Sequence, residues 1–217
     1  SVPDLSDDDL TSGSVATVIY LKEMELYISN VGDAQALLIR SEGGHKILTR
    51  KHDPAEPGER SRIRETGGFV SRQGKLNDVL EVSRAFGYVQ MSPSVIASPH
   101  ILNLTLGDTD EMILIASREL WEYLTPDFAV DVARSERNDL MVAAQKLRDL
   151  AIAFGATNKI MVMLLGVSDL KSKQRARYRT QSMSLIPAPG ADLDWGASRR
   201  RGKKGNLVGD SKLARLD

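Results

Sequence analysis

Apolar and polar positions in the first fifty residues predict short antiparallel strands. Residues 15–21 and 26–31 are rich in β-branched and apolar side chains, and the largely polar residues 22–25 separate them. Two such runs joined by a short loop are typical of a β-hairpin. A third run, residues 34–39, follows Gly32 and Asp33, where glycine permits a bulge or a sharp bend. We therefore expect an antiparallel meander over residues 15–47.

A central strand is predicted directly after Asp110 and Glu111. Residues 112–116 carry no charge, and such a run is too short for a buried helix but suits a strand that is covered on both faces. Ser117, Arg118 and Glu119 follow where the chain leaves the sheet, and functional side chains often lie at strand ends. This polar triplet has two interpretations, a functional strand end or a plain exposed turn.

Three helices are expected outside the strands. A short one follows Pro54 and Pro57, has Ile63 as its inward anchor and ends at Gly67-Gly68. Thr125 and Pro126 start a second, which runs to about Arg134. Asn138 is the expected N-cap of a third, whose apolar positions follow the 3.6-residue period as far as Gly155. A last strand, residues 159–167, is expected to be covered on both faces.

This order of elements predicts an α+β layered fold, with early strands that pair locally and helices laid outside them. The predicted organisation has three parts: an acidic, disordered lead-in over residues 1–11, a folded domain over residues 12–167, and a basic, flexible linker over residues 168–217. The linker has 12 Lys and Arg against 5 Asp and Glu, so it offsets an acidic domain and brings the formal net charge to zero.

Composition excludes several classes of protein. The sequence has no cysteine, so a disulfide framework and a thiolate metal site are both excluded. The N-terminus does not resemble an export signal, and no apolar run reaches the roughly 20 residues of a membrane-spanning helix. The basic linker lacks interleaved aromatic residues and a reader fold, so we expect no nucleic-acid partner.

Several short motifs occur in an order that resembles the type 2C family of metal-dependent protein phosphatases. The motifs lie within residues 12–16, 29–36, 48–54, 59–70, 82–87 and 113–121. The most specific are Asn30-Val31-Gly32-Asp33 and Ser83-Arg84-Ala85-Phe86-Gly87. The resemblance implies a β-sandwich flanked by helices and a two-metal centre that activates water against a phosphate ester. It also implies that the domain is truncated at its N-terminus, because the family's Asp-Gly-His-Gly segment precedes these motifs.

The resemblance further implies that the metal centre is degenerate. In the family, a metal-binding Asp follows the serine that matches Ser117, and a second one precedes the asparagine that matches Asn158; here these positions are Arg118 and Thr157. A guanidinium stays protonated and cannot ligate a cation, and a neutral hydroxyl is a weak ligand. Glu119 is one residue out of register. We therefore expect no catalytic residue, no metal ligand and no cofactor, and the hypothesis is a pseudophosphatase in which Arg118 replaces a metal's charge.

Other candidate residues have simpler interpretations. His52 is expected to be a hydrogen-bonded structural histidine, and Asp33 a turn residue rather than a ligand. Ser182 follows a basic stretch and resembles an acceptor site of a basophilic kinase, where a phosphate would offset local positive charge.

A second resemblance is to fungal adenylate cyclases, through residues 117–124 and the end of the linker, residues 209–217. In those proteins such an ending precedes the cyclase domain, which makes cyclic AMP from ATP with magnesium in Ras-linked signalling. The resemblance implies a non-catalytic regulatory module that contacts neighbouring cyclase domains and signalling proteins, in the cytoplasm or at a membrane surface through the parent protein. The alternatives are an active phosphatase with altered metal ligands and an interaction platform that is not coupled to cyclase output.

Overall fold

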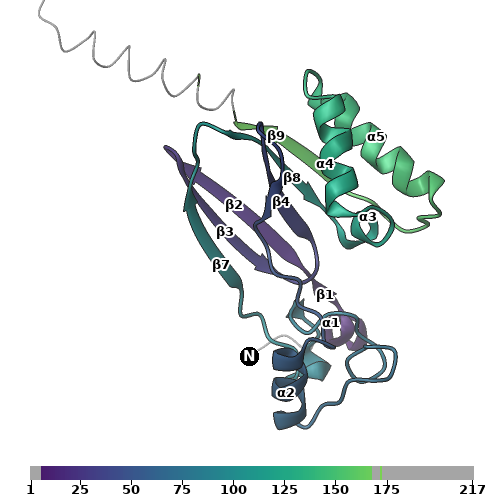
Figure 1. The fold of residues 1–217 in the computed structure, drawn as a ribbon. Helices are drawn as coiled ribbons and strands as arrows, with labels where there is room; N and C mark the ends of the chain where they lie inside the picture. The colour runs from purple at the N-terminus through teal and green to yellow at the C-terminus, as the bar shows by residue number, and fades with distance from the viewer. Residues whose placement is uncertain (1–5, 168–171, 173–217) are drawn as a thin grey trace, which may run out of the picture. The chain divides into compact units, whose positions relative to one another are not determined.

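The computed structural model describes residues 6–167 and 172, and it contains a β-sandwich with helices on one side (Figure 1). One sheet has the order β2-β3-β7, and the other has the order β5-β4-β8-β9. The strands of the first sheet are β2 (Ala16–Lys22), β3 (Glu25–Val31) and β7 (His100–Thr105). Those of the second are β4 (Gln35–Arg40), β5 (His45–Ile47), β8 (Asp110–Ala116) and β9 (Val162–Gly166). The expected α+β class is confirmed.

The first hairpin, β2-β3, pairs from Ala16 with Val31 to Lys22 with Glu25. Its loop is only Glu23 and Met24, two residues shorter than the sequence pattern suggested, because Lys22 and Glu25 continue the ladder. Glu23 takes the left-handed conformation, φ 58°, which two-residue hairpin turns require. On the outer face of this sheet the Tyr20 and Tyr27 rings lie 6.1 Å apart, both well exposed.

The expected meander over residues 15–47 is wrong, because β3 and β4 do not pair with each other. The chain turns at Gly32 and Asp33 and passes from one sheet to the other, where β4 pairs with β8. Gly32 has φ 105°, and a Cβ placed on it would lie 2.2 Å from Cγ1 of Val15. Only glycine therefore fits this corner, and what resembled a bulge is the point where the chain crosses between the layers.

Two apolar clusters hold the layers together. Between the sheets, buried side chains of β3, β4 and β8 form one cluster, which includes Leu26, Leu38 and Ile113. The opposite face of the second sheet carries the other cluster, against three helices: α3 (Arg118–Tyr123), α4 (Pro126–Ser135) and α5 (Leu140–Ala153). Successive side chains of β8 point to opposite faces of the sheet, so this strand contributes to both clusters. Ile113 and Ile115 face the other sheet, while Met112 and Leu114 face the helices.

Helices α4 and α5 lie where the periodicity predicted them. Thr125 caps α4 by accepting a hydrogen bond from the backbone N–H of Phe128, with Pro126 in the first turn. The expected N-cap of α5 is wrong by one residue, since Asp139 rather than Asn138 accepts from the backbone N–H groups of Met141 and Val142. A carboxylate at this position also interacts favourably with the positive end of the helix dipole.

Strand β9 is not covered on both faces, which corrects the expectation from its apolar run. Val162 and Leu164 pack against the helix-side cluster, while Met163 and Leu165 are 47% and 37% exposed. These two residues pair with Ile115 and Ile113, so they point toward the inter-sheet layer. In the described part of the chain, the inter-sheet layer therefore ends at this edge.

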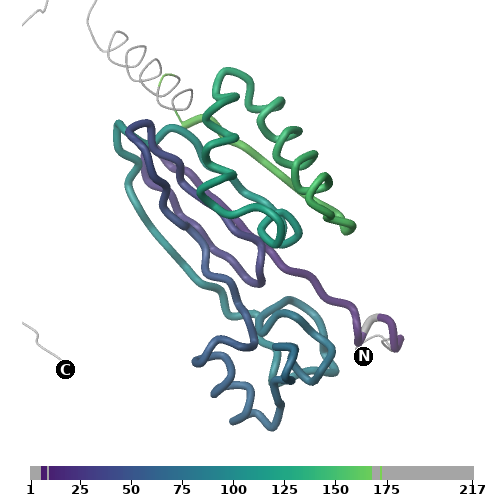
Figure 2. The backbone as a smooth tube through the Cα atoms, turned by 45° about the vertical axis from the view of Figure 1, so that its right-hand side comes forward, coloured from purple at the N-terminus to yellow at the C-terminus, as the bar shows by residue number. Residues whose placement is uncertain are grey.

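A smaller unit, residues 53–98, lies beyond one end of the sheets, and we call it the lobe (Figure 2). It contains α2 (Pro57–Glu65), the short strand β6 (Phe86–Gly87) and the 3-10 turn η1 (Val89–Met91). Its own apolar cluster surrounds Ile63, which is fully buried as expected, and includes Leu76, Val82, Ala85 and Val95. Strand β1 (Gly13–Ser14) pairs with β6, after the helix α1 (Asp7–Thr11) in a segment expected to be disordered.

Candidate functional site

The polar triplet after β8 forms the start of a helix rather than an exposed turn. Ser117 is the N-cap residue of α3, and its Oγ accepts a hydrogen bond from the backbone N–H of Met161, at 2.9 Å. Glu119 and Leu120 are buried, and Trp121 donates from Nε1 to the carbonyl of Ala116, at 3.1 Å. These contacts hold the start of α3 against the end of the central strand, so the side chain of Arg118 has a defined direction.

Arg118 lies among three carboxylates that come from three parts of the fold. Its Nε donates to Oε1 of Glu122, one helical turn later, at 2.5 Å. Its Nη1 donates to Oε2 of Glu81 in the lobe and lies 3.7 Å from Oδ2 of Asp33, at the corner between the sheets. The guanidinium is therefore the shared counter-charge of this cluster, which we call the Arg118 cluster: Asp33, Glu81, Arg118 and Glu122.

The environment changes the pKa values of these groups in opposite directions. Burial raises the pKa of Asp33, and the Arg118 guanidinium offsets part of that rise. The hydrogen bond from Lys75 lowers the pKa of Glu81, with a further contribution from Arg118. Burial opposes the charge of Arg118, but the carboxylates of Glu122, Glu81 and Asp33 raise its pKa. The guanidinium therefore remains a cation at every physiological pH.

Glu119 holds the segment that leads into β9. Its Oε1 accepts hydrogen bonds from the backbone N–H groups of Thr157 and Asn158, each at 3.0 Å, and its Oε2 accepts from Nδ2 of Asn158, at 2.9 Å. These bonds lower the pKa of Glu119, those from Asn158 most strongly. Both carboxylate oxygens of Glu119 thus accept hydrogen bonds that hold residues 157 and 158 in place. Thr157 contributes to these bonds through its backbone N–H rather than its side chain.

Glu59 is the centre of a second network of charges, inside the lobe. It is 5% exposed and accepts from Nη2 of Arg84, at 2.5 Å, and from Nη2 of Arg62, at 2.9 Å. Arg62 also donates to the carbonyl of Ser83, at 3.0 Å. Burial acts to raise the pKa of Glu59, but the hydrogen bonds from Arg84 and Arg62 outweigh it and lower the pKa to about 2. This network fixes the lobe's internal geometry.

His52 joins the lobe to the corner at Gly32. Its Nδ1 accepts the backbone N–H of Gly32 at 3.0 Å, which confirms the expected structural role and places the ring proton on Nε2. Nε2 is buried and has no hydrogen-bond partner among the described residues. Burial and the nearby Arg84 lower the pKa of His52 to about 4, so the ring is neutral at physiological pH.

The structure brings together four of the residues selected from the sequence. Asp33, Ser117, Arg118 and Asn158 line one shallow pocket, with Glu81, Glu119 and Glu122. Asn30, Gly32, Ser83, Arg84 and Gly87 do not line this pocket. Arg84 pairs with Glu59 inside the lobe, while other residues of this group contact or shape the backbone. For example, Asn30 exchanges two hydrogen bonds with the backbone of Arg50, at 2.7 and 3.1 Å. A Cβ placed on Gly87 would lie 2.3 Å from the carbonyl oxygen of Ser12.

Sequence reasoning missed Glu81 and Glu122. The spacing of Glu122, four residues after Arg118 on a helix, could have indicated an ion pair. Glu81 carried no such signal, because it comes from a loop 37 positions earlier. Ser182 lies outside the described residues.

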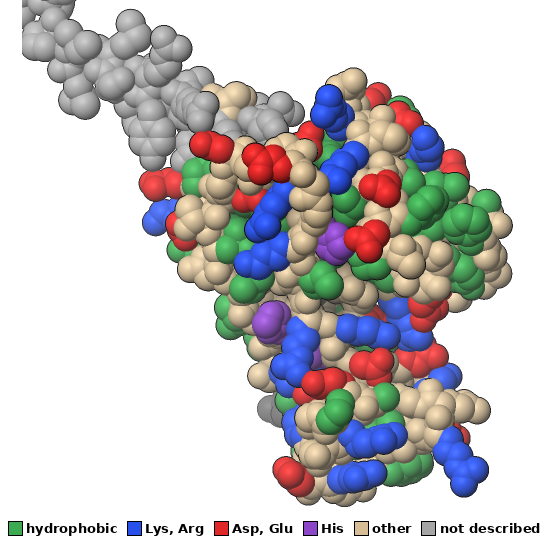
Figure 3. All heavy atoms as spheres, viewed as in Figure 1, with side chains coloured by type: hydrophobic (Ala, Val, Ile, Leu, Met, Phe, Trp, Pro, Cys, Tyr) green, Lys and Arg blue, Asp and Glu red, His purple; other side chains and the backbone are tan. Residues whose placement is uncertain are grey.

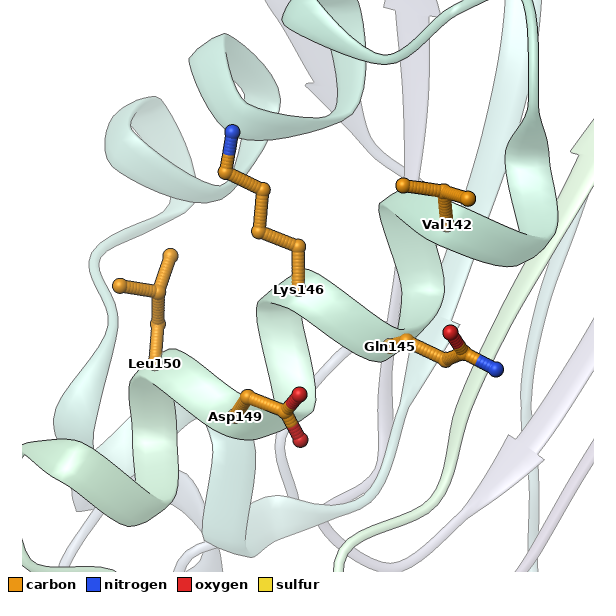
Figure 4. A pocket seen from close by; sticks show the side chains of 5 residues that line it. All are labelled: Val142, Gln145, Lys146, Asp149 and Leu150. Atoms are coloured by element: carbon orange, nitrogen blue, oxygen red, sulfur yellow. The ribbon is translucent and has the colours of Figure 1, made fainter.

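A second pocket lies on α5 and is lined by side chains of that helix alone (Figure 4). Lys146 extends from its middle, and Nζ donates to Oε1 of Glu136 at 2.8 Å. Val142 and Leu150 supply its apolar parts. The face in Figure 3 shows acidic and basic side chains interspersed over the sandwich and the lobe, without one dominant sign. The Arg118 cluster is therefore the better candidate for a functional site.

Residues 6–167 and 172 lack two further features. In this part of the chain, no three His, Cys, Asp or Glu side chains are arranged so that they could hold a metal ion together. None of the helices described there is long and apolar enough to cross a membrane.

Comparison with known proteins identifies the family. The sequence profile described as Protein phosphatase 2C matches residues 2–160. The chain is 52% identical over 216 residues to the adenylate cyclase of Neurospora crassa and 53% identical over 220 residues to that of Podospora anserina. Each alignment covers 98% of this chain, which spans only about a tenth of these relatives.

A solved structure supports the fold assignment. The phosphatase from a pathogenic strain of Toxoplasma gondii superposes with a TM-score of 0.59 and 29% identity, over 66% of this chain and 50% of that one. The profile match and the sandwich agree with each other. The chain belongs to the protein phosphatase 2C family, and its fungal relatives include adenylate cyclases that carry the same domain.

Proposed function

We propose that this chain is a non-catalytic, phosphatase 2C-like regulatory module of a fungal adenylate cyclase. The observation that carries the proposal is the position of Arg118, whose guanidinium pairs with Asp33, Glu81 and Glu122. The sequence similarity to two fungal adenylate cyclases extends over 98% of the chain and supports the parent protein. A module of this kind contributes a folded surface to the cyclase rather than a reaction of its own.

The residues present do not fit the two-metal centre that the family implies. Divalent ions need anionic oxygen ligands that approach to roughly 2.1 Å, and neither a guanidinium nor a neutral hydroxyl provides one. Arg118 and Thr157 stand at the two positions where the family has aspartates. The carboxylates nearest to Arg118 already accept hydrogen bonds from it, and its positive charge opposes the approach of a second cation.

Glu119 does not compensate for the loss. Both of its oxygens accept hydrogen bonds from residues 157 and 158, so a metal ion bound to Glu119 would displace the contacts that hold the segment before β9. Displacing them would break three hydrogen bonds to a charged acceptor, which is costly. No step of phosphate ester hydrolysis is therefore assigned to this chain, and we expect Mg²⁺ to serve the parent cyclase domain instead.

Regulation of a neighbouring domain is the function that remains. The two adenylate cyclases are about ten times longer than this chain, so other domains of such a parent protein are the module's first candidates for contact. The proposed partners are these cyclase domains and signalling proteins that act on them. The proposed location is the cytoplasm or a membrane surface reached through the parent protein.

Phosphatase turnover tests the proposal. The protein is purified with its neighbouring domains and assayed on p-nitrophenyl phosphate and a phosphothreonine peptide, with millimolar Mn²⁺ or Mg²⁺. We expect turnover no higher than that of the buffer, while a working phosphatase 2C in the same buffer is active. Metal-dependent turnover that Arg118→Ala or Asp33→Asn abolishes would contradict the proposal.

Deletion of residues 12–167 from the parent protein tests the regulatory part. We expect the cyclic AMP output to respond differently to the activators of the cyclase when the module is missing, although the cyclase domain itself is intact. An unchanged response would favour an interaction platform that is not coupled to cyclase output.

A further inference from the structure

Three separate segments meet at Arg118, and one of them belongs to the lobe. Asp33 lies at the corner between the sheets, Glu122 lies on α3, and Glu81 lies in residues 53–98. The side chain of Arg118 is 31% exposed, so the pairs are only partly screened by water. One side chain therefore joins the helix layer, the sheet corner and the lobe.

The joint between the lobe and the sandwich includes several polar contacts. The backbone N–H of Ser83 donates to the carbonyl of His52, and that of His52 donates to the carbonyl of Gly32, each at 3.0 Å. The lobe has an apolar cluster of its own, distinct from the two clusters of the sandwich. Polar contacts of this kind contribute less to stability than a shared apolar core. The ion pair between Arg118 and Glu81 therefore accounts for a larger share of the free energy that holds this joint together.

Residues 81–84 are held at both ends by arginine–glutamate pairs. Glu81 accepts from Arg118, which lies on α3, and Arg84 donates to Glu59, which lies inside the lobe. Ser83, between them, makes the backbone contact with His52. A substitution at Arg118 therefore affects residues 81–84, the same segment that contacts the backbone of His52.

We infer that the guanidinium of Arg118 is a built-in cation that fastens the lobe to the sandwich without any divalent ion. The inference rests on the proposed function, which assigns no metal ion to this site. A covalently attached charge cannot dissociate, so the position of the lobe is independent of the Mg²⁺ concentration. The module can then present one surface to its neighbours whether or not a divalent ion is bound.

Removal of the guanidinium should loosen the joint between the lobe and the sandwich. Without it, Asp33, Glu81 and Glu122 converge with no shared counter-charge, and like charges at short range repel one another. Lys75 still pairs with Glu81, with Nζ at 3.1 Å from Oε1, but it does not reach the other two carboxylates in the structure. Because no three of the described carboxylates are arranged to hold a metal ion together, Mn²⁺ should not take the place of the guanidinium.

Hydrogen exchange on the complete chain tests the inference. Amide exchange of residues 79–85 is measured by mass spectrometry for the wild type, Arg118→Gln and the control Arg148→Gln, each in EDTA and in millimolar Mn²⁺. Arg148 pairs with Asp149 on the surface of α5, far from the joint in sequence. We expect equal exchange of the wild type in both buffers, and roughly fivefold faster exchange in Arg118→Gln in both buffers.

Two outcomes would overturn the inference: faster exchange of the wild type in EDTA than in Mn²⁺, or the same exchange in Arg118→Gln as in Arg148→Gln. If Arg118→Gln does not fold, Glu81→Gln replaces it, because that change breaks the link to the lobe and leaves Arg118 paired with Asp33 and Glu122. These results are independent of phosphatase turnover. A protein without turnover whose lobe nevertheless depends on Mn²⁺ would refute the fastening role and leave the proposed function standing.

Discussion

The carboxylate of Glu119 accepts three hydrogen bonds from Thr157 and Asn158, which follow it by 38 and 39 positions in the chain. Through these bonds the first turn of α3 holds the segment that leads into the edge strand β9. Ser117 adds a fourth bond to the same region, by accepting from the backbone N–H of Met161. The beginning of α3 therefore organises both the Arg118 cluster and the entry to the last strand.

Glu119→Ala should destabilise the protein, because it leaves the donors of Thr157 and Asn158 without their acceptor. We expect the urea midpoint of unfolding to fall, while the slope of the free energy of unfolding against urea concentration stays the same. Glu65→Ala, at an exposed position of α2, is the matched control and should have little effect. Equal midpoints for the two variants would show that the Glu119 contacts do not stabilise the fold.

Ile63→Ala tests the apolar cluster of the lobe. Ile63 is fully buried, so the truncation should lower the free energy of unfolding by about 2–5 kcal/mol, through lost burial and the cavity that remains. Ile152→Ala removes the same atoms from a side chain that is 54% exposed and should cost no more than about 0.5 kcal/mol. Urea titration followed by circular dichroism measures both, and a small effect of Ile63→Ala would mean that the lobe contributes little to global stability.

The buried ring of His52 predicts a loss of stability in mild acid. Its pKa is lowered from 6.5 to about 4 in the folded protein, so between these values the unfolded chain binds a proton that the folded protein does not. The free energy of unfolding should therefore fall as the pH drops from 6.5 toward 4, by at most about 3 kcal/mol. Urea midpoints of the wild type and of His52→Gln, measured across this range, check the prediction. The urea midpoint of His52→Gln should change less with pH than that of the wild type. Equal pH dependence in the two proteins would contradict the lowered pKa of His52.

The stabilising contribution of Glu59 should be lost at a lower pH than that of His52. The pKa of Glu59 is lowered from 4.5 to about 2, so its contribution is complete above pH 4.5 and is lost as the pH falls toward 2. Glu59→Gln removes the charge between two half-buried guanidinium groups, and we expect a loss of roughly 3 kcal/mol at neutral pH. Arg64→Gln, on the exposed side of α2, is the control, and thermal unfolding at pH 7 compares them. A loss no larger than that of the control would mean that Arg62 and Arg84 find other acceptors.

Local sequence signals predicted the elements well where each element depends on its own residues. The cap at Thr125, the period of α5 and the uncharged run of β8 are all visible along the chain, and the structure has all three. The motifs also indicated the family and pointed to Arg118 and Thr157, because these depend on residue identity at a fixed spacing. Asp33 was interpreted only as a turn residue, yet its carboxylate is buried near Arg118.

Relationships between distant segments could not be predicted in this way. The apolar pattern around Gly32 is the same whether β3 and β4 pair or belong to opposite sheets, and only the packing of the two layers decides between them. Likewise β9 is apolar on both faces, but coverage depends on what the rest of the fold places there.

From its residues alone, the chain determined a cation at position 118 and the strand and helix that carry it. Which carboxylates surround that cation was decided by the tertiary structure, because Asp33, Glu81 and Glu122 come together only when the corner, the lobe and α3 have packed. Charge identity is a local property of one residue, whereas the distances that give a charge its effect are set by the whole fold.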